Sequence, residues 1–298
     1  MSITAFLLIF LSVFMHAAWN FLGKKDSPTM AFFWLAGVAG ALFWLPGAFL
    51  AQVDFTALPG KFWLFFLISS CFEVLYMTAL AFGYRNGDIS LVYPLGRSLP
   101  VLLIAAVTAL LGIGKTPGIL ALAGMVVIFA GCIIMPLKKW GDFRLKTYCS
   151  KVLFWVLLIG IGTTGYTICD SITMGILQEL PGGRSPLFKS IFYTFLVQLG
   201  IGAFMLPPVL GCKKERQELC QIWKRYPVYV AGIFSASAYV LVLLAMKFVT
   251  NVSFVQAFRQ MSLPIGILAG IFILKESSSA PKITGILLVI TGLIMTSL

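Results

Sequence analysis

The stretch SLVYPLGRSLP (residues 90–100) places two prolines, a glycine and an arginine at the start of a long apolar run. Arg97 is the only charged residue between Asp88 and Lys115. A charged side chain near the centre of a bilayer is costly, so it usually pairs with another group or marks a site of function. The stretch therefore predicts an unusual transmembrane helix that carries a permanent cation.

The whole chain has the composition of a membrane protein. Of its 298 residues, 60% are hydrophobic and 11% are charged, and the mean hydropathy is +0.99. A soluble domain is typically about a quarter charged. The net charge of +12 is spread over short clusters between apolar segments, a pattern that disfavours nucleic-acid binding and is typical of cytoplasmic loops. The six cysteines form no CxxC pair, so we expect no disulfide framework, zinc site or other cofactor.

Runs of about 20 apolar residues predict transmembrane helices, and their continuity favours an all-α polytopic fold over a β-barrel. The N-terminal run lacks the basic region and cleavage site of a signal peptide, so we expect it to be a retained first span. Residues 138–151 and 211–227 are expected to be loops. The ten predicted spans are 2–22, 30–51, 61–84, 89–111, 116–137, 151–177, 187–209, 226–248, 252–274 and 281–298.

Lysine and arginine lie mostly on one side of these spans. The loops after spans 1, 3, 5, 7 and 9 carry fifteen of them, whereas the opposite loops carry five. Because cytoplasmic loops are enriched in lysine and arginine, the richer side is predicted to be cytoplasmic and both termini non-cytoplasmic. The two remaining basic residues, Arg97 and Arg259, lie within spans. We expect a multi-pass protein of the cell (inner) membrane.

The chain also contains an internal repeat. RNGDISLVYPLGRSLP (85–100) aligns with FVTNVSFVQAFRQMSLP (248–264), with one extra residue in the second copy. The segment GMVVIFAGCIIM (124–135) aligns with GILLVITGLIMT (285–296), glycine on glycine at both positions. Spans 4 and 5 are therefore expected to be duplicated as spans 9 and 10.

The repeat divides the chain into two halves, residues 1–137 and 151–298, joined by a basic linker at 138–150. Because each half has five predicted spans, an odd number, the halves must cross the membrane in opposite directions. Such inverted repeats are common in secondary transporters, whose substrate sites lie near the mid-membrane between the halves, often beside broken helices. Residues expected to break the helices are Pro94, Gly96, Pro100 and Pro264.

The ten spans, the duplication and ISLVYPLGRSLPV together resemble the drug/metabolite transporter superfamily, specifically its EamA-type repeats. VSFVQAFRQMSLPIGILAGIFILKES (252–277) is similar to the second copy, including the Lys275-Glu276 pair. The resemblance covers nearly the whole chain and implies transport, but it implies little about the substrate. The sequence departs from the pattern at GIGK (112–115), where the first copy often carries glutamate.

Several polar residues in the predicted spans are candidates for a site. Paired guanidinium groups suit carboxylate, phosphate or phosphonate, but the arginines and carboxylates could also simply neutralise one another. Burial favours a neutral carboxyl group and a nearby arginine favours a charged one, so a buried carboxyl could carry protons. The substrate-binding candidates are Arg97, Arg259, Tyr93, Tyr76, Tyr239, Gln256 and Asn20, and the candidates for proton coupling or a charge network are Glu73, His16 and Asp170.

We therefore predict a secondary transporter of small polar metabolites, anionic or zwitterionic, that is not an enzyme and that has protons as a candidate coupling ion. The expected partners are a small-molecule substrate and the lipid bilayer, with the chain acting as a monomer or homodimer. A lipid or lipid-phosphate translocase is an alternative that the sequence does not separate from the first. An intramembrane enzyme is disfavoured because HExxH and GxSxG motifs are missing. A scaffold or receptor would leave the buried charges without a ligand.

Overall fold

The protein is all-α. The computed structural model describes residues 2–26, 29–87, 89–142, 151–181, 184–265, 268 and 278–298. Eleven α-helices lie in these ranges: α1 (Ile3–Asp26), α2 (Met30–Leu50), α3 (Gly60–Asn86), α4 (Ile89–Leu110), α5 (Ile119–Ile134), α7 (Lys151–Glu179), α8 (Pro186–Gly211), α9 (Lys213–Ile222), α10 (Tyr226–Met246), α11 (Val252–Phe258) and α13 (Ala280–Ser297). Three short 3-10 helices accompany them: η1 (Phe55–Ala57), η2 (Trp140–Asp142) and η3 (Arg259–Met261).

Eight of the described helices are long and apolar enough to cross a membrane, namely α1, α2, α3, α4, α7, α8, α10 and α13. The apolar helix α5 is shorter, at 16 residues. These nine helices coincide with nine of the predicted spans and confirm a multi-pass membrane protein. The predicted span 252–274 begins with α11 and η3, but most of its second half, 266–267 and 269–274, lies outside the described residues.

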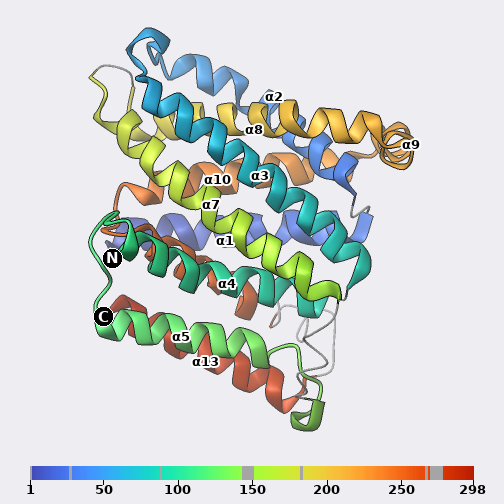
Figure 1. Ribbon diagram of the computed structural model, residues 1–298, viewed down its shortest axis with the longest axis vertical. Helices are drawn as coiled ribbons and strands as arrows, with labels where there is room; N and C mark the ends of the chain where they lie inside the picture. Colours follow the sequence, from blue (N-terminus) through green and yellow to red (C-terminus); the bar gives the residue numbers. More distant parts are fainter. Residues whose placement is uncertain are drawn as a thin grey trace.

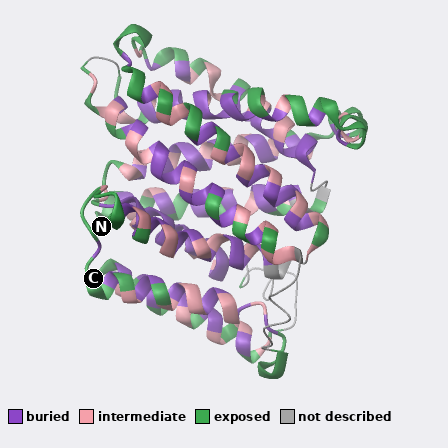
Figure 2. Ribbon diagram, in the orientation of Figure 1, coloured by how far each residue is buried: buried purple, intermediate pink, exposed green. Residues whose placement is uncertain are grey.

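The long helices lie side by side in an elongated bundle (Figure 1), with α2 and α8 toward one edge and α5 and α13 at the other. Both ends of the chain lie on the same side of the bundle. The most extensive helix contacts are α3 with α7, α5 with α13, α1 with α10, and α2 with α8. Figure 2 shows buried residues along the middle of the bundle and exposed ones on its outer faces. Many of the exposed residues are large and apolar, as expected where helices face lipid.

Glycines allow α5 and α13 to pack closely. A Cβ atom on Gly124 would lie 2.6 Å from the carbonyl oxygen of Gly292, and one on Gly292 would lie 2.6 Å from that of Gly124. The same reciprocal contact joins Gly131 and Gly285, at 2.8 Å in each direction. Small residues let membrane helices approach this closely. The pairing of early with late residues also shows that the two helices run antiparallel.

The helix break that the sequence predicts in span 4 is absent, because α4 is continuous through Pro94 and Pro100. In the second copy, where Pro264 predicts a break, α11 gives way to the 3-10 turn η3 at residues 259–261. Pro264 follows that turn, and its missing N–H leaves the carbonyl of Gln260 without a donor four residues later. Between the two prolines of α4, the backbone carbonyl of Arg97 accepts a hydrogen bond from Gln260 Nε2 of η3 at 2.9 Å.

The predicted loop 211–227 also contains a helix that the sequence analysis missed. Residues KKERQELCQI of α9 are mostly strong helix formers. Glu215 and Ile222 are its buried residues, whereas most of its remaining side chains are exposed. The segment is therefore a short amphipathic helix that packs on the end of the bundle, against α2 and α8.

Candidate functional site

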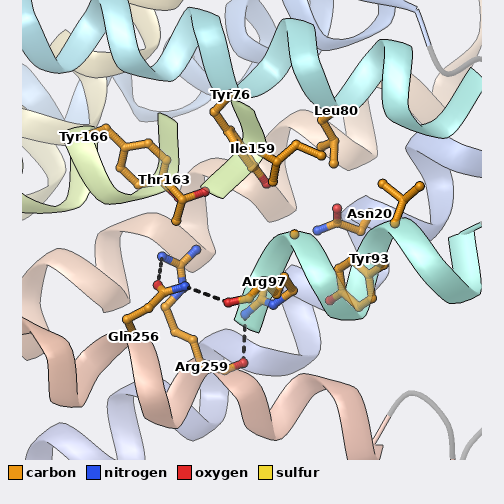
Figure 3. Close-up of a pocket in the computed structure, with 12 residues that line it drawn as sticks. Asn20, Tyr76, Leu80, Tyr93, Arg97, Ile159, Thr163, Tyr166, Gln256 and Arg259 are labelled. Atoms are coloured by element: carbon orange, nitrogen blue, oxygen red, sulfur yellow. Dashed lines mark hydrogen bonds between the residues drawn. The ribbon is translucent and has the colours of Figure 1, made fainter. Parts of the chain in front are cut away.

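The two arginines that the sequence singles out meet where α4 crosses η3. Arg97 Nη2 donates a hydrogen bond to the carbonyl oxygen of Arg259 at 2.8 Å, and Gln260 Nε2 donates in return to the carbonyl of Arg97 at 2.9 Å. Side chains of each segment thus bind the backbone of the other. Arg259 is only 5% exposed, and Arg97 is partly buried. The structure therefore brings this predicted pair together inside the bundle (Figure 3).

The positive charge of the two guanidinium groups is not neutralised by an ion pair. Among the described residues the one salt bridge joins Arg85 to Glu215, so no described carboxylate forms one with Arg97 or Arg259. Arg259 Nη1 instead donates to the side-chain oxygen of Gln256 at 3.4 Å. Buried Arg97 Nε has no hydrogen-bond partner within the described part of the chain. The site therefore keeps both its charge and an unused donor, which an anion could engage.

A small cavity lies directly beside the arginines. Its lining includes both guanidinium-bearing residues, Gln256 and three further predicted residues, Asn20, Tyr76 and Tyr93. The Tyr93 ring lies under Arg97, with the guanidinium carbon 5.4 Å from its centroid, a cation–π distance. The cavity has about 10 Å³ of space, room for about one water molecule. A metabolite could bind here only after the helices move apart.

A second cavity shares Tyr76, Tyr166 and Arg259 with the first. It has about 30 Å³ of space, and Glu73, His16 and Tyr239 complete its polar lining together with Gln198 and Ser235. Glu73 forms no hydrogen bond or salt bridge with another described residue. Glu73 therefore shares the second cavity with Arg259, whereas Arg97 lines only the first.

His16 presents an unpartnered nitrogen in this second cavity. Its Nδ1 accepts a hydrogen bond from Trp19 Nε1 at 3.1 Å, so the neutral imidazole carries its proton on Nε2. That atom is buried and has no hydrogen-bond partner among the described residues. One turn later, Asn20 is satisfied, donating to the His16 carbonyl at 2.9 Å and accepting from Tyr84 at 3.1 Å. Of these two predicted residues, His16 is therefore the one with an unused polar atom.

Asp170 lies apart from both cavities. It is 0% exposed, and its carboxyl oxygens accept hydrogen bonds from the hydroxyl groups of Ser69, Tyr193 and Tyr239. The first two donors come from α3 and α8 and the third comes from α10, so Asp170 on α7 ties three neighbouring helices together. Sequence analysis grouped Asp170 with Glu73 and His16, but its surroundings are those of a structural hub.

A glycine of α7 allows the aromatic wall between the cavities to form. A Cβ atom on Gly162 would lie 2.9 Å from the backbone nitrogen of Tyr76, so α7 can approach α3 closely only without a side chain there. The approach sets Tyr166 against Tyr76, with ring centroids 5.6 Å apart, and against Tyr239, at 6.2 Å. Site residues absent from our predicted set are Tyr166, Thr163, Gln198 and Gln260. The signal for them was polarity within apolar spans.

Polar ties lie toward both ends of the bundle, on either side of these cavities. At the lysine-rich end, Glu215 of α9 is 1% exposed, binds Arg85 of α3 at 2.9 Å and accepts from the backbone N–H of Ala31 in α2 at 2.9 Å. At the opposite end, Asn251 Nδ2 donates to Thr108 Oγ1 at 3.1 Å. Each tie joins a segment before residue 137 to one after residue 151. Polar ties between these two parts of the chain are thus present toward both ends of the bundle.

Comparison with known proteins supports the fold alone. No family model matches the sequence, and no curated protein matches it. A solved structure, described only as a crystal structure of a protein, superposes with a TM-score of 0.70 at 13% sequence identity. The match covers 99% of this chain and 96% of that chain. The same arrangement of helices therefore recurs in a protein whose sequence is only 13% identical. A shared fold does not establish a shared function, so the site must be interpreted from its own chemistry.

The different surroundings of Asp170 and Glu73 predict different effects of the matched amide substitutions. Asp170→Asn replaces hydrogen bonds to a charged acceptor, which are roughly twice as strong as neutral ones, and should reduce stability by about 1–3 kcal/mol. Glu73→Gln removes no hydrogen bond to a described residue and should cost less than about 1 kcal/mol. Thermal unfolding of the purified variants in detergent measures both. Equal losses of stability would contradict the structural role given to Asp170.

Proposed function

We propose that the protein is a secondary transporter of small anionic or zwitterionic metabolites, belonging to the EamA-type drug/metabolite transporters. The observation that carries this proposal is the pair Arg97 and Arg259, two guanidinium groups beside one enclosed cavity and without a described carboxylate partner. Keeping two cations in an apolar bundle is costly. A substrate carboxylate or phosphate would offset that cost, because planar guanidinium donors can bind two oxygens at once.

The proposed architecture is ten spans in two inverted five-helix repeats. The glycine contacts between α5 and α13 support it, because the sequence repeat pairs Gly124 with Gly285 and Gly131 with Gly292. In space the contacts are Gly124 with Gly292 and Gly131 with Gly285. A two-fold axis between two copies of one helix produces such exchanged partners. The antiparallel direction of the two helices is the direction that inverted repeats require.

The contacts among the remaining helices support the same relation. If α1, α2 and α3 correspond to α7, α8 and α10, then the contact of α3 with α7 has its counterpart in the contact of α10 with α1, and α2 with α8 pairs the equivalent helices. The location of both chain ends on one side (Figure 1) fits an even number of crossings. We propose that this side is non-cytoplasmic, as the lysine and arginine distribution indicates.

Transport would then proceed by alternating access. Rocking of the two halves would break the tie between Glu215 and Arg85 at one end or the tie between Asn251 and Thr108 at the other. Either opening would enlarge the cavities around Arg97 and Arg259, which have about 10 and 30 Å³ of space in the described conformation. In such a cycle the described conformation, with both ties formed, would correspond to an occluded intermediate.

Glu73 is the candidate for proton coupling. It lies in the second cavity, which shares Arg259 with the substrate-site cavity. A substrate anion and an ionised Glu73 would compete for the guanidinium group of Arg259. Substrate binding to Arg259 would therefore be weaker while Glu73 is ionised. Proton uptake by Glu73 would leave Arg259 available to the anion. His16 lines the same cavity and is a second candidate for carrying the proton.

A lipid-phosphate translocase is the second candidate. A third hollow, of about 530 Å³, lies between α1, η3 and α13 and is lined mostly by apolar residues. Phe258 and Met261, on either side of Arg259 in the sequence, contribute to it. An acyl chain could occupy this hollow while a phosphate group binds the arginines. The binding experiment below distinguishes the two candidates through the lipid phosphates it includes.

Loss of either arginine should weaken substrate binding. We expect a panel of amino acids, monocarboxylates, phosphate monoesters and short-chain lipid phosphates to contain ligands that raise the unfolding midpoint of the wild type by mass action. Arg97→Gln and Arg259→Gln should each weaken the apparent affinity by at least about tenfold, because a charged hydrogen bond contributes roughly 1.5–3 kcal/mol. The exposed loop variant Arg184→Gln is the control and should bind normally. Unchanged binding by both site variants would refute the anion site.

Coupling through Glu73 predicts a specific defect in proteoliposomes. The wild type should produce a change of internal pH when a ligand from the panel is driven across the membrane. Glu73→Gln cannot bind and release a proton and should abolish that change, whereas Glu179→Gln, at the exposed end of α7, should retain it. A pH change of normal size in Glu73→Gln would exclude this residue as the proton carrier without excluding transport.

A further inference from the structure

A separate hollow lies at the lysine-rich end of the bundle, where α5 ends and α13 begins. It has about 590 Å³ of space and is lined by residues 135–140 and 278–282. None of the residues assigned above to substrate binding or proton coupling lines it. It therefore requires an explanation that is independent of the transport site.

Hydrogen bonds hold the walls of this hollow in place. Ser279 Oγ donates to the carbonyl of Leu137 at 2.9 Å, which ties the start of α13 to the segment after α5. Ser279 Oγ also accepts from the backbone N–H of Lys282 at 3.3 Å, capping α13. On the other wall, the backbone N–H of Lys139 donates to the carboxylate of Asp142 at 3.0 Å, closing the turn η2. The hollow is thus built by local structure at both of its edges.

The charge of the hollow suits an anion. Three lysines, Lys138, Lys139 and Lys282, are among its lining residues, and the carboxylate of Asp142 accepts a hydrogen bond from the backbone N–H of Lys139 at its edge. No carboxylate in the described ranges forms a salt bridge with Lys138 or Lys139, and both side chains are exposed. Several ammonium groups around one concave site suit a phosphate group, which offers several anionic oxygens.

The surroundings point to a phosphate that belongs to a lipid. Trp140, which is 53% exposed, stands in the lining, and tryptophan favours the membrane–water interface. Below the hollow, Ile283, Leu287, Ile290 and Ile294 of α13 are all exposed. Their spacing of three or four residues places them in one stripe along the helix. An apolar track thus leads from the lysines along the outer face of the bundle.

We propose that this hollow binds the headgroup phosphate of an anionic phospholipid from the leaflet on the lysine-rich side of the protein. An acyl chain of that lipid would lie along the stripe on α13. Basic pockets between membrane helices on the cytoplasmic side bind such headgroups. The lipid would bridge α5 and α13, the pair that the reciprocal glycine contacts hold together. The headgroup site shares no lining residue with the cavities beside the arginines, so it does not depend on whether the protein transports anions, although Ile290 and Ile294 of the stripe also line the third hollow.

The test compares two triple variants with the same loss of charge. Lys138→Gln/Lys139→Gln/Lys282→Gln alters the hollow, whereas Lys213→Gln/Lys214→Gln/Lys224→Gln alters the α9 region at the same end of the bundle. Native mass spectrometry of full-length protein titrated with phosphatidylglycerol or phosphatidylcholine measures binding. We expect wild type and the α9 variant to prefer phosphatidylglycerol, and the hollow variant to lose at least tenfold in affinity for it.

A charge-conserving variant separates misfolding from loss of the site. Lys138→Arg/Lys139→Arg should keep the preference for phosphatidylglycerol, with an unfolding midpoint like that of the wild type. Equal weakening by both glutamine variants, or equal binding of the two lipids by the wild type, would overturn the proposal. Saturable, lysine-dependent binding of inorganic phosphate that displaces phosphatidylglycerol at millimolar concentration would assign the hollow to a soluble anion and would also overturn it.

Discussion

The structure depends on how two permanent cations are kept inside an apolar bundle. Arg97 and Arg259 cannot be neutralised by losing a proton, because a guanidinium group stays charged in proteins. They are held by a backbone carbonyl, a glutamine and a tyrosine ring, all of them neutral partners. Such partners satisfy hydrogen-bond donors but leave the charge in place. Among the described residues no carboxylate forms a salt bridge with either arginine, and this is the basis of the proposed anion site.

The neighbouring helices are arranged around this requirement. Close packing through Gly162 brings the tyrosine wall against the arginines, and Asp170 fixes Tyr239 from behind through a hydrogen bond. Glu73 and His16 then lie across that wall from Arg97, in a cavity bounded by Arg259. The two buried carboxyl groups, Asp170 and Glu73, therefore have different surroundings. Asp170 accepts hydrogen bonds from three neighbouring helices, whereas Glu73 shares a cavity with Arg259 and is the proposed proton carrier.

The sequence predicted the elements well because membrane spans follow from length and hydropathy, which are local properties. It also predicted that Arg97 and Arg259 belong together, since duplication relates their helices. It could not predict the hydroxyl partners of Asp170, which come from three other helices. Of the predicted helix breaks, those in α4 are absent, since the helix continues through Pro94 and Pro100, whereas an interruption does lie at η3, shortly before Pro264. Helix α9 was predicted as a loop because its sequence is highly charged, and the burial of Glu215 depends on contacts with other helices.

The central claim is that the cavity beside the arginines opens to each side of the membrane in turn. Thr163 lines this cavity, whereas Thr173, on the same helix, lines neither central cavity and is 0% exposed. In a variant without the native cysteines, Thr163→Cys should react with an impermeant thiol reagent from either side of the membrane, and Thr173→Cys from neither. A Thr163→Cys variant that is unreactive from both sides, or reactive from one side only under all conditions, would contradict the account.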